Sequence, residues 1–145
     1  MTSPAFQDLS VILDNRPGAL EDFGETLGAA GVSLEGGGVF THDGVPIAHF
    51  LVDDAEAGRA ALERAGIGPV TISDVSMLRL DQDAPGQLGA FTRMLGDAGV
   101  QIRLQYSDHE HHLVVMVDPA DRAACAEIAA RWDAERDQRR ASAGL

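Results

Sequence analysis

The sequence predicts an α+β fold made of two copies of one unit, in which strands and helices follow the order βαββαβ. The first observation is an internal repeat: residues 16–20 (Arg-Pro-Gly-Ala-Leu) return as residues 84–88 (Ala-Pro-Gly-Gln-Leu), 68 positions later. The second is that this register continues past the motif and pairs Phe23 with Phe91. The third is that each copy alternates between strand-like and helix-like hydrophobic patterns. A repeat of this length is a complete supersecondary unit, so it determines the architecture.

In the first copy, alternating apolar residues predict a strand at 9–13, and Leu20, Phe23 and Leu27 at helical spacing predict a helix that Gly31 ends. The next strand, 32–41, contains three glycines at 36–38, which indicates a bulge or the close approach of another backbone or a ligand. The rest of the copy is predicted as a hairpin turn at 42–44, a strand at 47–52, a helix capped by Asp53 or Asp54 that ends at Gly66, and a strand from Val70.

The second copy follows the same plan but lacks its last strand. We predict a strand at 75–80, a helix at 86–98, a strand at 100–106, a turn at 107–111, a strand at 112–117 and a helix from Pro119 or Ala120 to beyond Trp132. No apolar run follows, so either a neighbouring chain supplies the missing edge or the tail covers it. We expect unit boundaries at 1–73 and 74–132, and a polar C-terminal tail at 133–145 that frays or projects.

Composition limits the classes of function. The 23 acidic and 11 basic residues give a formal charge of −12, which repels nucleic acid and anionic membrane surfaces alike. The N-terminus lacks the features of a signal peptide, no stretch is long and apolar enough to span a bilayer, and the single Cys125 cannot form an internal disulfide. We therefore expect a cytoplasmic protein. No serine lies in a nucleophile elbow, and no cofactor motif is present, which favours a non-catalytic protein without a cofactor.

The two Pro–Gly loops resemble those of the ACT domain, a family of small modules that bind amino acids and regulate other proteins. The resemblance is carried by a strand, then residues 14–20 (Asp-Asn-Arg-Pro-Gly-Ala-Leu), a helix, Ala30-Gly31-Val32 and a hairpin. It covers essentially the whole chain as two tandem copies. It implies ferredoxin-like units that pack side by side, with helices on one face of antiparallel sheets. It also implies a regulatory protein, expected as a homodimer, whose amino-acid ligand lies at the Pro–Gly loops between units.

The resemblance also implies which residues contact the ligand. Helix starts such as those beside Gly18 and Gly86 present backbone N–H groups that suit a carboxylate, and Arg16 could pair with the same group. In the second copy, Asp83 could accept from the ligand's ammonium group. The ligand-binding residues that we predict from the two loops and the following strands are Asn15, Arg16, Pro17, Gly18, Ala19, Leu20, Ser33, Asp83, Ala84, Pro85, Gly86, Gln87, Leu88 and Gln101.

A histidine-rich segment, residues 108–112 (Asp-His-Glu-His-His), supports an alternative function. If this segment were extended, alternate residues would share a face, and His109 and His111 would present two imidazoles together. Zinc, nickel or copper accept such ligands, with His112 as a possible third. The alternative is therefore an accessory or enzymatic protein that uses this hairpin, with or without a divalent metal.

Overall fold

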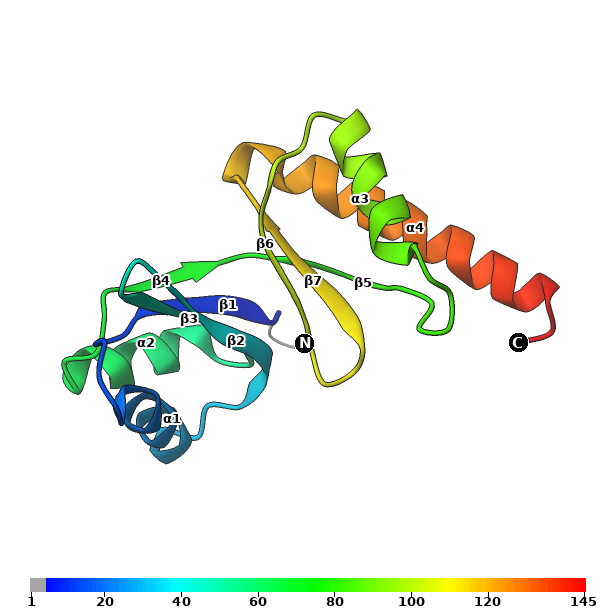
Figure 1. Ribbon diagram of the computed structural model, residues 1–145. Helices are drawn as coiled ribbons and strands as arrows, with labels where there is room; N and C mark the ends of the chain where they lie inside the picture. Colours follow the sequence, from blue (N-terminus) through cyan, green and yellow to red (C-terminus); the bar gives the residue numbers. More distant parts are fainter. Residues whose placement is uncertain (1–4) are drawn as a thin grey trace. The chain divides into compact units, whose positions relative to one another are not determined.

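The computed structural model describes residues 5–145, and the chain divides into two compact units, one ending at Asp74 and the other running from Val75 to Leu145 (Figure 1). Unit 1 contains β1 (Gln7–Ile12), α1 (Ala19–Ala29), β2 (Leu34–His42), β3 (Val45–Val52), α2 (Ala55–Arg64) and β4 (Val70–Ser73). Its sheet is antiparallel with the order β2-β3-β1-β4. The predicted α+β fold of βαββαβ type is confirmed.

Unit 2 repeats this plan with three strands. It contains β5 (Ser76–Arg79), α3 (Gln87–Asp97), β6 (Ile102–Ser107), β7 (His112–Val117), a 3₁₀ turn (Pro119–Asp121) and α4 (Arg122–Ser142). The sheet order is β5-β7-β6, again antiparallel. The final strand that the sequence lacks is therefore also missing from the sheet of unit 2, all of whose residues the structure describes.

The core of each unit lies between one face of its sheet and its two helices. In unit 1, Leu9 and Val11 of β1 pack with Phe23 of α1 and Leu62 of α2, and all four are fully buried. In unit 2, Leu78 of β5 packs with side chains of α3 and α4, including the repeat partners Phe91 and Leu95 and the aromatic Trp132. Apolar residues at equivalent positions of the repeat therefore form the cores of the two units.

The three consecutive glycines of β2 lie where the strand bulges and another backbone comes close. The pairing of β2 with β3 shifts register between Leu34 and Gly36. Gly37 has φ 130°, and a Cβ built on it would overlap the carbonyl oxygen of His49 and lie 2.8 Å from the Cα of Phe50. Only glycine fits that position, because a side chain would force the two strands apart.

The polar segment after Trp132 differs from our expectation of a fraying tail, since α4 continues to Ser142. Its inner face is bonded to β5: the Trp132 indole N–H donates to the Arg79 carbonyl at 2.8 Å, and Asp133 accepts from the Arg79 N–H at 2.9 Å. Arg136 donates to Asp81 at 2.8 Å. At Arg79, α4 therefore covers the edge of β5. This is the alternative in which the C-terminal segment, and not a neighbouring chain, covers the edge left by the missing strand.

Turn and cap residues behave as their chemistry predicts. Asp43 and Gly44, at the β2–β3 turn, have φ of 48° and 75°, the left-handed values of a tight hairpin. Asp54 caps α2, with its carboxylate accepting from the Ala57 N–H at 3.1 Å. Across residues 5–145, no helix combines the length and the apolar character that crossing a bilayer would require.

Candidate functional site

The Pro–Gly motif forms a tight turn just before each helix. The first helix, α1, begins at Ala19, directly after Pro17 and Gly18. Gly18 has φ 85° and ψ −9°, and the Ala19 N–H points back to the Arg16 carbonyl at 3.4 Å. These values describe a type II turn, with proline at its second position and glycine at its third. Gly86 repeats the geometry with φ 86° and ψ 2°, so the turns of the two copies match in their backbone.

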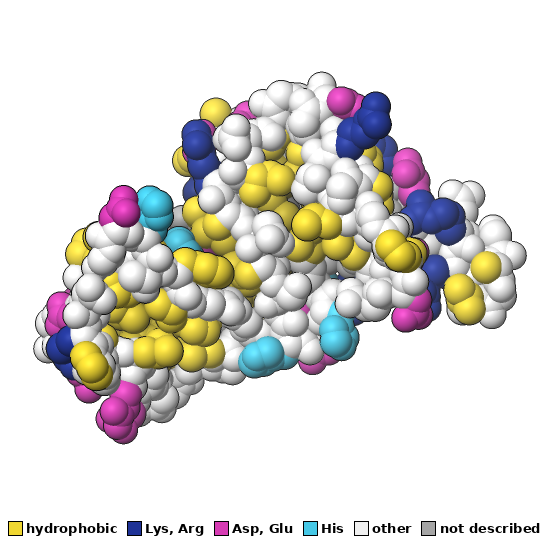
Figure 2. All heavy atoms as spheres, viewed as in Figure 1, with side chains coloured by type: hydrophobic (Ala, Val, Ile, Leu, Met, Phe, Trp, Pro, Cys, Tyr) yellow, Lys and Arg dark blue, Asp and Glu magenta, His cyan; other side chains and the backbone are white. Residues whose placement is uncertain are grey.

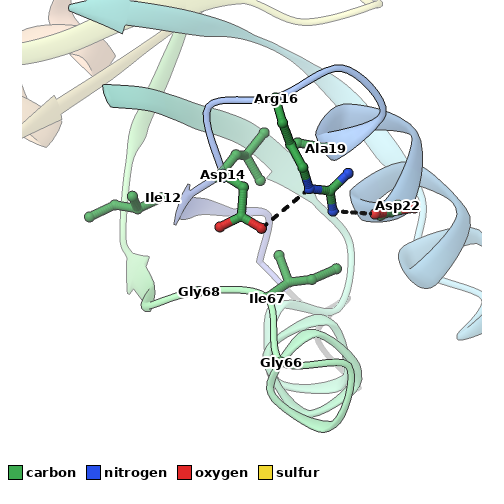
Figure 3. A pocket seen from close by; sticks show the side chains of 9 residues that line it. Ile12, Asp14, Arg16, Ala19, Asp22, Gly66, Ile67 and Gly68 are labelled. Carbon is green, nitrogen blue, oxygen red and sulfur yellow. Dashed lines mark hydrogen bonds and ion pairs between the residues drawn. The ribbon is translucent and has the colours of Figure 1, made fainter. Parts of the chain in front are cut away.

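Arg16 lies over the start of α1 and is held there by carboxylates. Its guanidinium donates to Asp22 at 2.7 Å, lies 3.5 Å from Asp14 and donates to the Pro17 carbonyl at 3.2 Å (Figure 3). The hydrogen bond to Asp22 is the main cause that raises the pKa of Arg16 above its ordinary value. The side chains of Arg16 and Asp22 are half exposed, so a ligand carboxylate could exchange with Asp22 at the guanidinium.

A small cavity lies beneath Arg16, between the first Pro–Gly loop and the segment that joins α2 to β4. Figure 3 shows Ile12 and Ile67 lining it from these two sides, with Gly66 and Gly68 in the second segment. Its volume is about 30 Å³, which is room for one or two water molecules rather than for an amino acid. The wall formed by residues 66–68 was not among the predicted site residues.

A larger hollow of about 320 Å³ lies on the other side of the loop, between it and the strands β2 and β3. This volume is at the lower end of the range of small-molecule sites. Its base is apolar and buried, formed by Leu13, Ala19 and Pro46, with Val39 half-buried beside them. The remaining lining residues are Asp14, Asn15, Arg16, Pro17, Leu20 and Thr41. We call this space the loop hollow; five of the predicted ligand-binding residues line it.

Asn15 forms one rim of the loop hollow. Its amide nitrogen lies 3.5 Å from the position that a Cβ on Gly44 would take, so the side chain reaches over the β2–β3 turn. Figure 2 shows hydrophobic side chains gathered on the surface of unit 1. The exposed ones include Leu20 in the first turn of α1. An amide, a guanidinium and apolar side chains thus meet around one opening.

A third hollow, of about 280 Å³, lies on the far side of Arg16 and is acidic. Asp14, Asp22 and Glu25 line it, and Arg16 is its only cationic side chain. Three carboxylates against one guanidinium leave a net negative charge. A ligand carboxylate is therefore disfavoured in this hollow relative to the loop hollow.

Ser33 lies at the opposite end of unit 1 from Asn15. Its neighbour Leu34 pairs with Val52, which in turn pairs with Gln7 at the start of β1, whereas the loop follows Ile12 at the end of β1. Five residue steps along a strand separate these ends by about 17 Å. Ser33 donates instead to Glu35 at 2.7 Å. A ligand held by Asn15 cannot also touch Ser33 of the same unit.

Gln101 has the corresponding place in unit 2, one residue before β6, and its amide donates to the Ile102 carbonyl at 3.1 Å. The second Pro–Gly loop follows β5 at the other end of that sheet, where Asp83, Ala84, Pro85 and Gly86 are all exposed. Within each unit, the structure therefore brings the loop residues together but not the polar residue that precedes the second strand.

The second loop replaces an apolar base with a polar cluster. Asp81 and Gln87 stand at the positions equivalent to Leu13 and Ala19. The Asp81 N–H donates to the Gln87 side chain at 3.3 Å, and Arg136 of α4 donates to the Asp81 carboxylate at 2.8 Å. The two loops also differ in Asn15 against Asp83 and in Arg16 against Ala84. The polar cluster is the larger difference, and it was not predicted because Arg136 lies in the segment expected to be a free tail.

The histidine segment is a closed turn, as predicted for residues 107–111, and not the extended strand that would place His109 and His111 on one face. Asp108, almost fully buried, accepts from the Glu110 and His112 N–H groups at 3.0 and 2.7 Å, and its other oxygen lies 2.8 Å from the His112 imidazole. His111 has φ 63°. These bonds replace the strand geometry. Within residues 5–145, no three His, Cys, Asp or Glu side chains are placed to hold a metal ion.

Cys125 is a core residue, as its position in an alanine-rich helix suggested. It is fully buried in unit 2, and burial is the main cause that raises the pKa of its thiol. A buried, protonated thiol is a poor nucleophile. The indole N–H of Trp132 is bonded within unit 2 at Arg79, which is a structural role.

Comparison with known proteins agrees with this architecture. Protein BT0572 from Bacteroides thetaiotaomicron has a similar structure, with a TM-score of 0.72, 24% identity and coverage of 88% of both chains. The regulatory subunits of aspartate kinase from Thermus thermophilus and Thermus flavus are also similar in structure, with TM-scores of 0.67 and 0.65. Their sequence identities to this chain are 16% and 19%, and each comparison covers 88% of this chain and 92% of the subunit. No family model matches the chain, and no curated protein matches it in sequence. These structures show that the chain has an α+β fold made of two ferredoxin-like units, as the resemblance to ACT domains predicted.

Proposed function

We propose that this protein is a non-catalytic regulatory module that binds a small amino acid in the loop hollow of unit 1. The observation that carries the proposal is the hollow itself: it has the volume of a small-ligand site, and Asn15 and Arg16 line it. The fold supports the regulatory part, since the Thermus chains with the same architecture are regulatory subunits of aspartate kinase.

In the proposed complex, the ligand carboxylate lies at the start of α1 and at Arg16. The first turn of α1 contributes backbone N–H groups, and the capping position has no side-chain bond to them. Arg16 exchanges its contact with Asp22 for the ligand carboxylate. The ammonium group of the ligand then lies near Asp14, which also lines the hollow, and Asn15 orients the ligand through its amide.

The competition between Asp22 and the ligand has a consequence for affinity. Breaking the contact at 2.7 Å between Arg16 and Asp22 offsets part of the gain from pairing Arg16 with the ligand. Exposed pairs of this kind are worth about 0.2–1 kcal/mol, so the competition is expected to weaken ligand binding by no more than about fivefold.

The experiment is a thermal melt of the full chain, followed by circular dichroism, with each of the twenty amino acids. A ligand present at 100 times its dissociation constant stabilises the folded state by about 2.7 kcal/mol, which raises the melting temperature by several degrees. Asn15→Ala is expected to remove the rise, whereas Asp83→Ala, the same truncation at the equivalent position of the second loop, is expected to keep it. If no amino acid at millimolar concentration shifts the melt, the proposal is wrong.

A further inference from the structure

We infer that the ligand of the loop hollow is an amino acid with an uncharged aliphatic side chain, and that each chain binds one such molecule. The inference rests on the proposed function and adds to it the class of side chain and the number of sites. It follows from what forms the base of the hollow, from where the charges lie, and from what replaces that base in the second copy.

The inner surface of the loop hollow is apolar. Leu13, Ala19 and Pro46 form its buried base, and Val39 packs against both the hollow and the core of unit 1. A methyl or methylene group placed there is removed from water without leaving a polar group unpaired. A charged group in the same place would lose its hydration, and the base offers it no hydrogen bond in return. The inner part of the hollow therefore favours an aliphatic side chain.

The charged and amide groups lie where the head group of the ligand would be. Asn15, Arg16 and Asp14 belong to the loop itself, on the rim rather than at the base, and all three are exposed. Arg16 separates the loop hollow from the acidic hollow of Asp22 and Glu25. A second carboxylate, carried by the ligand side chain, would lie against the apolar base, where no hydrogen-bond donor replaces its hydration, so acidic amino acids are disfavoured. Polar contacts thus orient the amino and carboxyl groups, and the aliphatic end points inward.

The second loop cannot offer the same base. Asp81 and Gln87 occupy the positions of Leu13 and Ala19, and the two are bonded to each other at 3.3 Å. Arg136 neutralises Asp81 at 2.8 Å, with only 14% of the arginine side chain exposed. An aliphatic group inserted there would have to displace a bonded and partly buried ion pair. One site per chain follows, although the Pro–Gly turn occurs twice.

The test is isothermal titration of the full chain with a ligand series that grows by one methylene group at a time. From alanine to 2-aminobutyrate to norvaline, each added methylene is expected to increase affinity about fourfold. The stoichiometry is expected to be one per chain, with lysine and aspartate binding more weakly than leucine. A flat series, two equivalent sites, or lysine or aspartate binding as tightly as leucine would overturn the inference.

Two matched variants locate the aliphatic contact. Leu20 and Leu88 occupy the same position of the repeat and are 49% and 43% exposed, so truncating either leaves the core intact. Leu20→Ala is expected to weaken norvaline binding about fivefold, whereas Leu88→Ala is expected to leave it unchanged. Equal effects of the two variants would contradict the placement. If amino acids bind without an aliphatic preference, only this inference fails; if none binds, the proposed function fails as well.

Discussion

Replacing Gly37 with alanine should destabilise unit 1 much more than the same change at its neighbour Gly38. The new Cβ would overlap the His49 carbonyl oxygen and lie 2.8 Å from the Phe50 Cα, and both of these atoms belong to the backbone of β3. A side chain at φ 130° adds backbone strain. We expect about 1–3 kcal/mol from the strain and about 1 kcal/mol from one strand hydrogen bond lost as β2 and β3 separate, or about 2–4 kcal/mol in total.

Two other glycines of unit 1 serve as controls for the same chemical change. At Gly38 a Cβ would meet only the ring of Phe40, at 3.2 Å, and that exposed ring can turn aside. Gly38→Ala should therefore cost less than about 1 kcal/mol. Gly24 lies inside α1, and a Cβ there meets nothing within 4 Å. Gly24→Ala should stabilise the unit by about 0.5–1 kcal/mol, because alanine loses less backbone entropy in a helix.

The assay is urea denaturation followed by far-ultraviolet circular dichroism. Fluorescence does not report on unit 1 directly, since the single Trp132 and the single Tyr106 both lie in unit 2. With a denaturant dependence of about 1–1.5 kcal/mol per molar urea, Gly37→Ala should lower the midpoint for unit 1 by about 1.3–4 M. A midpoint equal to that of Gly38→Ala would refute the close approach of β2 and β3 at this position.

Two further predictions concern unit 2, and Trp132 fluorescence reports both. Asp108→Ala leaves the Glu110 and His112 N–H groups without their acceptor and should lower the free energy of unfolding by about 2–4 kcal/mol. The control His109→Ala, at an exposed position, should change it by less than about 0.5 kcal/mol. Similar costs for the two variants would show that the turn does not depend on Asp108. Arg103 donates to Asp118 at 2.7 and 2.8 Å, and these hydrogen bonds lower the pKa of the Asp118 carboxyl below its ordinary value. The pair therefore stabilises the fold at any pH above that ordinary pKa, and the stabilisation is lost as the pH falls through the lowered pKa. Arg103→Gln should therefore be less stable than the parent at neutral pH, and the difference should disappear as the pH falls through the lowered pKa of Asp118. A difference that persists in acid would contradict this linkage.

The parts of the fold that could be predicted from the sequence are those that local chemistry determines. Apolar spacing and the repeat register identified both cores, and turn residues such as Asp43-Gly44 and the Asp54 cap located the element ends. The Pro–Gly motif marked where each helix begins. These features depend on neighbours within a few residues, so each could be predicted without knowing the rest of the chain.

The features that escaped prediction depend on contacts between distant segments. The polar end of α4 has the composition of a free tail, but its side chains bond to Arg79 and Asp81, which lie 53 to 55 positions earlier in the sequence. The base of the loop hollow needs Pro46 and Val39, which the turn of β2 into β3 brings to the first loop. The turn of the histidine segment was predicted, but the bonds that close it were not, because nothing in the pattern indicates that Asp108 accepts from two backbone N–H groups. Alternation alone cannot predict such a contact.

The most direct test of the central claim is to locate the ligand by nuclear magnetic resonance. Backbone amide resonances of the full chain are followed during titration with leucine. The largest shifts are expected at residues 15–20, beside the loop hollow, and at Val39 and Thr41 of β2. The equivalent loop, residues 83–88, is expected to stay unchanged. Shifts centred on the second loop, or no shifts at saturating leucine, would contradict the assignment of the ligand site to unit 1.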